Sequence, residues 1–184
     1  RRVPARQRGE AAGDPLAMMV RRLDIAMTLG GEAEFLQHLG IDLEAMKKAM
    51  RKDTKIVYIV NPNNPIPSIL AKKELEDFVK EVSKKCMVFV DEAYYEYLSP
   101  KINKSAVSLI NKHKNLYVTR SFSKIYGLAS LRVGYGISSQ DNISILKNYK
   151  QPFNSNLFAQ KAALLALKDF TFTRESKKNN DIAR

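Results

Sequence analysis

Short apolar runs rich in β-branched residues alternate with amphipathic stretches along this chain, and that alternation narrows the possible folds most. The runs 55–60 (KIVYIV) and 86–93 (CMVFVDEA) have the length and continuous apolar character of strands buried on both faces. A helix is expected between them, over 72–85, because four apolar residues recur there on one helical face. These residues are Leu75, Phe78, Val79 and Val82.

The same alternation continues on either side. We expect a helix over 41–50 with Asp42 as its N-cap, strands over 115–120 and 131–138, and a helix over 157–170. The Leu and Ala face of the last helix is assigned to the core. The pattern predicts an α/β fold with a largely parallel (mixed) sheet and flanking helices.

Polar residues follow three of the predicted strands. The segment 61–67, with three prolines and three asparagines, reads as a loop after the first strand. Asp91 ends the second strand, and Ser121, Ser123 and Lys124 follow the third. Because ligands of such sheets bind outside the carboxyl ends of the strands, we expect these groups to converge on one site.

The residue types at this site favour one kind of cofactor. Neither histidine is placed as a base, which disfavours hydrolysis by a Ser–His–Asp arrangement. A lysine near an arginine can serve as a free amine that reacts with an aldehyde. Arginine and hydroxyl groups suit a phosphate, and a carboxylate suits a protonated ring nitrogen. An aldehyde, a phosphate and a pyridine nitrogen together describe pyridoxal 5′-phosphate.

Four stretches resemble, in order and separation, the large domain of fold-type I pyridoxal-phosphate-dependent aminotransferases, most of all histidinol-phosphate aminotransferase. They are NPNNP (61–65), VDEAYYEY (90–97), SFSKIYGLASLRVGYG (121–136) and QPFNSN (151–156). The resemblance covers about residues 23–184 and is most specific around Lys124.

The resemblance implies a role for each matching residue. Lys124 holds the cofactor as a Schiff base and moves the proton, and Asp91 pairs with the pyridine nitrogen. Asn64 and Tyr94 donate to the phenolic oxygen. The phosphate is anchored by Ser121, Ser123 and Arg132. Two further residues are expected near the neighbouring active site of a homodimer, namely Asn154 and Asn156.

The implied reaction is amino-group transfer between a small-molecule amino donor (histidinol phosphate or another amino acid) and a 2-oxo acid such as 2-oxoglutarate. Aromatic amino acids and a related phosphate-ester decarboxylation remain open alternatives.

The match is incomplete, and it departs from the family pattern in places. Ile66 and Pro67 stand where the family has Thr-Gly, and Ser130 stands where glycine is usual. The family's phosphate-binding glycine loop and ring-stacking aromatic match nothing in residues 1–40, nor does Arg174 or Arg184 match its substrate-carboxylate arginine. We therefore expect weak or no transaminase activity from this chain alone.

These matches divide the chain into three parts. Residues 1–22 form an Arg-rich extension, expected to be poorly ordered, and 23–170 form a partial pyridoxal-phosphate-binding large domain. Residues 171–184 would begin the connection to a small C-terminal domain.

Charge and composition leave one other class of function open. The net charge of +12, with six arginines in residues 1–22, also suits a basic nucleic-acid-binding module on a passive α/β scaffold. The lysines, however, do not cluster with aromatic residues in a recognition pattern. With Cys86 as its single cysteine and no apolar run long enough for a membrane span, the chain is expected in the cytoplasm.

Overall fold

The computed structural model describes residues 40–66, 68–99 and 105–183. The predicted extension 1–22 and the first part of the predicted domain 23–170 lie outside these ranges. So does Pro67, one of the two departures from the family pattern in the asparagine loop.

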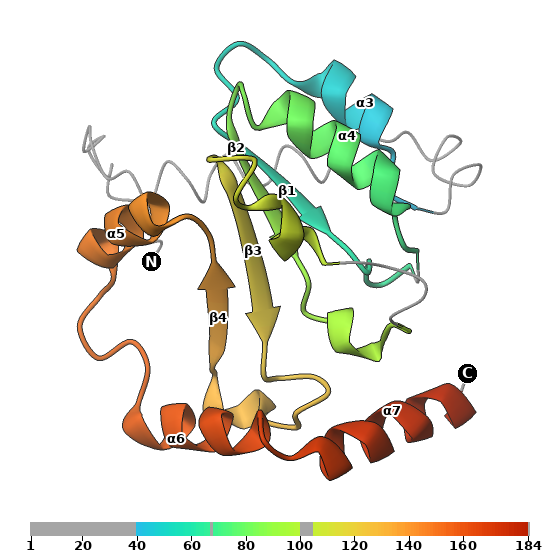
Figure 1. Cartoon of the computed structure of the whole chain (residues 1–184), viewed down its shortest axis with the longest axis vertical. Coiled ribbons are helices and arrows are strands. Elements are labelled where there is room, and N and C mark those ends of the chain that lie inside the picture. Colours follow the sequence, from blue (N-terminus) through green and yellow to red (C-terminus); the bar gives the residue numbers. More distant parts are fainter. Residues whose placement is uncertain (1–39, 67, 100–104, 184) are drawn as a thin grey trace, which may run out of the picture.

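The described strands form one four-stranded sheet in chain order, β1-β2-β3-β4 (Figure 1). They are β1 (Ile56–Val60), β2 (Met87–Asp91), β3 (Leu116–Ser121) and β4 (Gly134–Ile137). The first three are parallel, and β4 pairs antiparallel with β3. The predicted mixed, largely parallel sheet is confirmed.

Two helices, α3 (Leu43–Ala49) and α4 (Lys72–Val82), lie on one face of this sheet (Figure 1). The predicted cap of α3 is present, since Oδ1 of Asp42 accepts a hydrogen bond of 2.8 Å from the Ala45 amide. All four apolar residues predicted for one face of α4 are buried, and they pack on the sheet as the main core. The core side chains of the strands are Val57, Ile59, Val88, Val90, Leu116 and Val118.

The prediction that the first two strands are buried on both faces is wrong. Their burial alternates, with buried residues on the α3–α4 face and half-buried ones on the other. On that second face the rings of Tyr58, Phe89 and Tyr117 lie in a row, with centroid separations of 6.5 and 4.6 Å. Aromatic and β-branched residues supply the apolar character without full burial.

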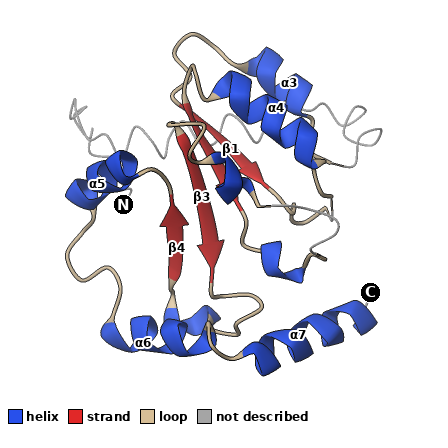
Figure 2. Ribbon diagram, viewed as in Figure 1, coloured by secondary structure: helices blue, strands red, loops and turns tan. Residues whose placement is uncertain are grey.

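Three helices follow the sheet, α5 (Gln140–Tyr149), α6 (Leu157–Ala166) and α7 (Phe170–Ala183). Figure 2 shows α6 and α7 lying one after the other beyond the end of the sheet at which β3 finishes. The prediction of one helix over 157–170 is wrong. The helix ends at Ala166, and the Asp169 carboxylate accepts a hydrogen bond of 2.9 Å from the Phe172 amide where α7 begins.

The assignment of the Leu and Ala face of this segment to the core is also wrong. In α6 only Ala159 and Ala163 are buried, whereas the large side chains of Phe158 and Leu165 are 81% and 70% exposed. In the part of the chain that the structure describes, no helix is both long and apolar enough to span a bilayer.

Candidate functional site

The parallel register brings the ends of β1, β2 and β3 to one edge of the sheet. Asp91 stands opposite Val60 on one side and Thr119 on the other. Just beyond the strands, the Asn61 amide donates to the Asp91 carbonyl (2.9 Å), and the Glu92 amide donates to the Thr119 carbonyl (2.8 Å). The three predicted polar segments therefore begin side by side.

Three of the predicted site residues form a chain of contacts. The amide Nδ2 of Asn64 donates a hydrogen bond of 2.6 Å to the Tyr94 hydroxyl. The ammonium Nζ of Lys124 lies over the face of the Tyr94 ring, 4.9 Å from its centroid. A cation over an aromatic face is attracted to the ring, so this contact directs the lysine toward the tyrosine. Lys124 itself is exposed.

The Asp91 carboxylate is held by two donors. Its Oδ1 accepts a hydrogen bond of 2.9 Å from the Ala93 amide, and its Oδ2 accepts one from the Tyr58 hydroxyl. The first bond is the local turn contact that a purely structural aspartate would make. The second comes from a neighbouring strand, and Tyr58 is a site residue that the sequence did not single out.

The environment of Tyr58 favours its neutral, proton-donating form. Burial, and after it the hydrogen bond to Asp91 and the negative charge there, raise the pKa of the Tyr58 phenol above its ordinary value. The signal in the sequence is the strand alternation, because Tyr58 shares the face of Asp91 while Val57 and Ile59 point into the core. Because Tyr58 lies within a continuous apolar run, its position on the Asp91 face was not evident from the sequence.

The predicted phosphate anchors are only partly brought together. Oγ of Ser121 accepts a hydrogen bond of 3.0 Å from the Ser123 amide, which tightens the turn before Lys124. The Phe122 amide donates to the Val133 carbonyl (3.2 Å), so the Arg132 segment runs beside this turn. The Arg132 side chain is exposed, and its Nη1 donates to the Ala129 carbonyl (2.8 Å).

Arg132 also has an unusual backbone conformation, since its φ of 50° lies in the left-handed region. Such a conformation is uncommon for a residue other than glycine and often accompanies a functional position.

The remaining predicted residues have local roles. Asn156 caps α6, its Oδ1 accepting a hydrogen bond of 2.7 Å from the Ala159 amide, and the side chain of Asn154 is exposed. In the asparagine loop, Asn61 is buried, and its Oδ1 accepts a hydrogen bond of 3.0 Å from the Leu70 amide. Asn61 thus anchors the loop that presents Asn64.

A buried ion pair supports the site from the opposite face of the sheet. Glu92, 1% exposed, accepts hydrogen bonds from the Arg120 guanidinium (2.9 and 3.1 Å), the Ser105 hydroxyl (2.7 Å) and the Ala106 amide (2.7 Å). The Arg120 guanidinium also lies 4.2 Å from the centroid of the Tyr95 ring. This network connects β2 and β3 just before Tyr94 and Lys124.

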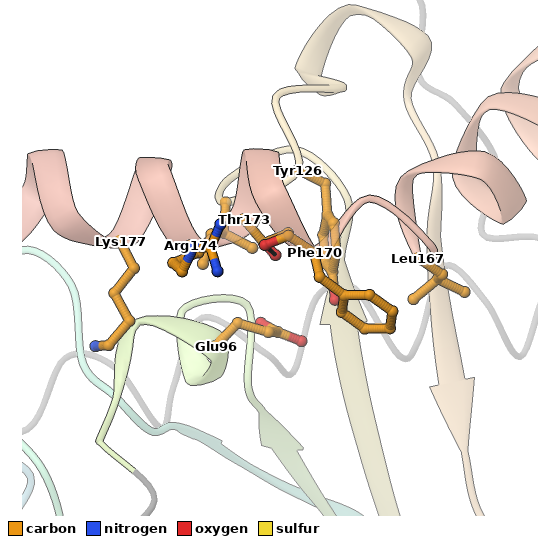
Figure 3. Close-up of a pocket in the computed structure, with 8 residues that line it drawn as sticks. Glu96, Tyr126, Leu167, Phe170, Thr173, Arg174 and Lys177 are labelled. Carbon is orange, nitrogen blue, oxygen red and sulfur yellow. Dashed lines mark hydrogen bonds between the residues drawn. The ribbon is translucent and has the colours of Figure 1, made fainter.

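A separate cavity of about 310 Å³ lies between α7 and the turn that follows Lys124 (Figure 3). It is lined by Glu96, Ile125, Tyr126, Leu167, Phe170, Thr173, Arg174 and Lys177. Both carboxylate oxygens of Glu96 are buried and accept no hydrogen bond from the described residues, and the Arg120 Nη1 is 3.6 Å from Oε1. Burial, only partly opposed by the charge of Arg120, raises the pKa of this carboxyl.

The donor set at the carboxyl edge fits pyridoxal phosphate chemically. It offers an amine, a carboxylate with acceptor capacity left on each oxygen, and a hydroxyl–amide pair for an oxygen of the ring. Hydroxyl groups and a guanidinium follow β3 for a phosphate. Within the described ranges, no cluster of three or more histidine, cysteine, aspartate or glutamate side chains could hold a metal ion.

Comparison with known proteins places this geometry in one family. The family model "Aminotransferase class I and II" matches residues 32–183. A histidinol-phosphate aminotransferase of Brevibacillus brevis is 45% identical over 139 residues, which are 76% of this chain and 38% of that protein. Histidinol-phosphate aminotransferase 1 of Nitrosococcus oceani is 43% identical over 150 residues, 82% of this chain and 40% of its own length.

Solved structures give the same result. The histidinol-phosphate aminotransferase of Sinorhizobium meliloti, in complex with pyridoxal-5′-phosphate, matches with a TM-score of 0.70 and 28% identity, over 76% of this chain and 38% of that one. The enzyme of Clostridium acetobutylicum matches with a TM-score of 0.65 and 32% identity, over 74% and 41%.

These matches confirm the predicted fold-type I large domain and its partial extent, because the chain spans about two fifths of the relatives' length. They lend no support to the nucleic-acid-binding alternative. The chain belongs to the class I and II aminotransferase family.

Proposed function

We propose that this chain carries the pyridoxal-phosphate-binding centre of a histidinol-phosphate aminotransferase. The observation that carries the proposal is the contact chain from Lys124 through Tyr94 to Asn64, on the same sheet edge as Asp91. The names of the relatives support the substrate class. When bound, the cofactor supplies an aldehyde that condenses with amines and a ring that accepts electrons.

Each residue at the edge has a task in this proposal. Lys124 would hold the cofactor through its side-chain amine and would hold and move the proton at the substrate carbon. Asp91 would accept a hydrogen bond from the protonated ring nitrogen, and the Tyr94 hydroxyl and the Asn64 amide would donate to the phenolic oxygen. The phosphate would be held by Ser121, Ser123 and Arg132. Arg132 would release its bond to the Ala129 carbonyl or share its other nitrogens, since a guanidinium has five donors.

The partners follow from the family. The chain's share of a full-length reaction would be amino-group transfer between histidinol phosphate, or another small amino donor, and a 2-oxo acid in the cytoplasm. Because the chain matches only about two fifths of its relatives, we expect the isolated chain to have weak or no transaminase activity.

A homodimer is also proposed. Phe153 and Phe158 are 100% and 81% exposed near the start of α6, and the exposed Asn154 lies between them in sequence. Covering such side chains would be favourable by the hydrophobic effect. Sedimentation velocity tests this proposal. Phe158→Ser should shift a dimer toward monomer, whereas a wild-type chain that is monomeric at all concentrations would contradict it.

Borohydride reduction after incubation with pyridoxal 5′-phosphate, followed by peptide mass mapping, tests the proposed site. We expect one phosphopyridoxyl group per chain, on Lys124, and its loss in Lys124→Arg, which keeps the charge but cannot form the bond. Label spread over many surface lysines, or no label, would contradict the proposal.

A further inference from the structure

The Asp91 carboxylate has one contact that local chain geometry does not explain. The bond from Ala93 to Oδ1 spans two residues and would form in many turns. The bond from the Tyr58 hydroxyl to Oδ2 joins residues 33 apart on neighbouring parallel strands. It is therefore a feature of the folded sheet, present only when β1 and β2 are in register.

The ring of Tyr58 is itself held in place. It stacks on Phe89 at 6.5 Å between centroids with an interplanar angle of 24°, and Phe89 stacks on Tyr117 at 4.6 Å and 8°. Phe89 stands opposite Tyr58 in the register and two residues before Asp91 on the same face. The ring of Tyr58 is thus fixed in position, with its hydroxyl hydrogen-bonded to the Asp91 carboxylate.

A carboxylate that pairs with a ring nitrogen must hold one orientation. With the Ala93 amide alone, the carboxyl group could rotate about its last torsion, which is broad for aspartate. With a donor on each oxygen the plane is fixed, and each oxygen retains a lone pair for one more donor. A hydrogen bond to a charged acceptor is among the stronger ones in proteins.

We propose that Tyr58 is a positioning residue, whose hydroxyl holds the Asp91 carboxylate in the orientation in which it receives the protonated ring nitrogen of pyridoxal phosphate. The inference rests on the proposed function and adds to it the residue that acts through Asp91. Tyr58 touches the carboxylate, and its effect on the cofactor passes through that group.

The cofactor-free protein provides the first test. With ¹³Cζ-labelled tyrosine, the resonance that disappears in Tyr58→Phe is assigned to Tyr58. Asp91→Ala should shift this resonance, because the phenol loses its acceptor. Tyr117→Phe is the same substitution on the same sheet face. It should shift the Tyr58 resonance by no more than a small ring-current change. A Tyr58 resonance unchanged by Asp91→Ala would overturn the proposal.

The second test uses the protein with pyridoxal phosphate, read by trapping at Lys124 and by the resonance of a ¹⁵N-labelled pyridine nitrogen. Tyr58→Phe should raise the half-saturating cofactor concentration about tenfold and move the nitrogen resonance toward that of the unprotonated ring. Tyr117→Phe should change the concentration less than about twofold and leave the resonance in place.

The two parts separate the possible failures. A wild-type chain that takes no label on Lys124 would contradict the proposed function, while the ¹³C measurement would still support or overturn the hold of Tyr58 on Asp91. Labelling of Lys124 with equal affinity and an identical ¹⁵N resonance in Tyr58→Phe would overturn the inference and leave the proposed function standing. Thermal unfolding of each variant shows whether it is folded.

Discussion

The amide of Asn64 and the hydroxyl of Tyr94 are 2.6 Å apart, although 30 residues separate them in the chain. Each lies in a loop that follows a different strand, so their bond closes the carboxyl edge of the sheet between β1 and β2. The Lys124 ammonium then lies over the tyrosine ring from the loop after β3. The loops that follow β1, β2 and β3 are therefore connected to one another through the side chain of Tyr94.

Removing the amide should weaken cofactor binding. A hydrogen bond of this kind contributes about 0.5–1.5 kcal/mol, so Asn64→Ala should raise the half-saturating pyridoxal phosphate concentration about two- to tenfold. Trapping at Lys124 over a concentration series measures it. Asn63→Ala is the control, because among the described residues Asn63 bonds through its backbone amide, to the Ser68 carbonyl. Equal effects of the two substitutions would contradict a specific role of Asn64.

Breaking the buried ion pair should destabilise the fold. Glu92→Ala leaves the Arg120 guanidinium, 16% exposed, without its main acceptor, and should lower the free energy of unfolding by about 3–5 kcal/mol. Urea denaturation followed by circular dichroism measures the loss. Asp77→Ala, which removes the exposed pair with Lys73, should have little effect. A Glu92→Ala variant as stable as wild type would show that the network is not structural.

Two glycines of β4 should respond oppositely to alanine. A Cβ at Gly134 would lie 2.8 Å from the Arg120 carbonyl oxygen, so Gly134→Ala should cost about 1–3 kcal/mol of unfolding free energy. At Gly136 the nearest atom would be 4.0 Å away, and Gly136→Ala should stabilise by about 0.5–1 kcal/mol, because it restricts the unfolded chain. Urea denaturation followed by circular dichroism measures both changes in the free energy of unfolding. A stabilising Gly134→Ala would refute the close approach of β3 and β4.

Stability should depend on pH through Glu96. Burial raises the pKa of this carboxyl above 4.5 in the folded state, so the folded chain binds the proton more tightly than the unfolded one. This contribution to stability is complete below pH 4.5 and is lost as the pH rises through the raised pKa. Glu96→Gln cannot lose that proton, and its stability relative to wild type should therefore increase from about pH 4 to pH 7.

Glu81 provides the opposite control. The charge of Lys47 lowers the pKa of the Glu81 carboxyl, so its contribution is present above pH 4.5 and is lost as the pH falls through the lowered pKa. The stability of Glu81→Gln relative to wild type should accordingly fall as the pH rises. Denaturation at a series of pH values tests both. Parallel curves for Glu96→Gln and wild type would contradict the burial of Glu96.

The sequence predicted the parts of the fold that depend on local pattern. The β-branched runs gave β1 and β2, and the spacing of Leu75, Phe78, Val79 and Val82 gave the buried face of α4. The convergence of the three strand ends followed because parallel neighbours end at one edge. Their residue types favoured the cofactor, and the resemblance of four sequence stretches to a known family indicated the family.

The elements that the sequence did not yield lack such a pattern. The apolar residues of α5, such as Ile145 and Leu146, are not buried, so this helix has no core face like that of α4. The break between α6 and α7 falls in the short segment 167–170, between two apolar stretches, where the Asp169 side chain caps the new helix. Tyr58 was hidden for a related reason, since its hydroxyl sits in a run that reads as core.

The order of the sheet has a consequence for how the chain can be made. Among the described strands, each one after β1 pairs with the described strand synthesised before it. None of these four described strands has to wait for a distant partner among them, so this part of the sheet can grow by one strand at a time as the chain emerges. The loop bearing Lys124 can therefore emerge after the strands and loops that carry Asn64, Asp91 and Tyr94 have paired.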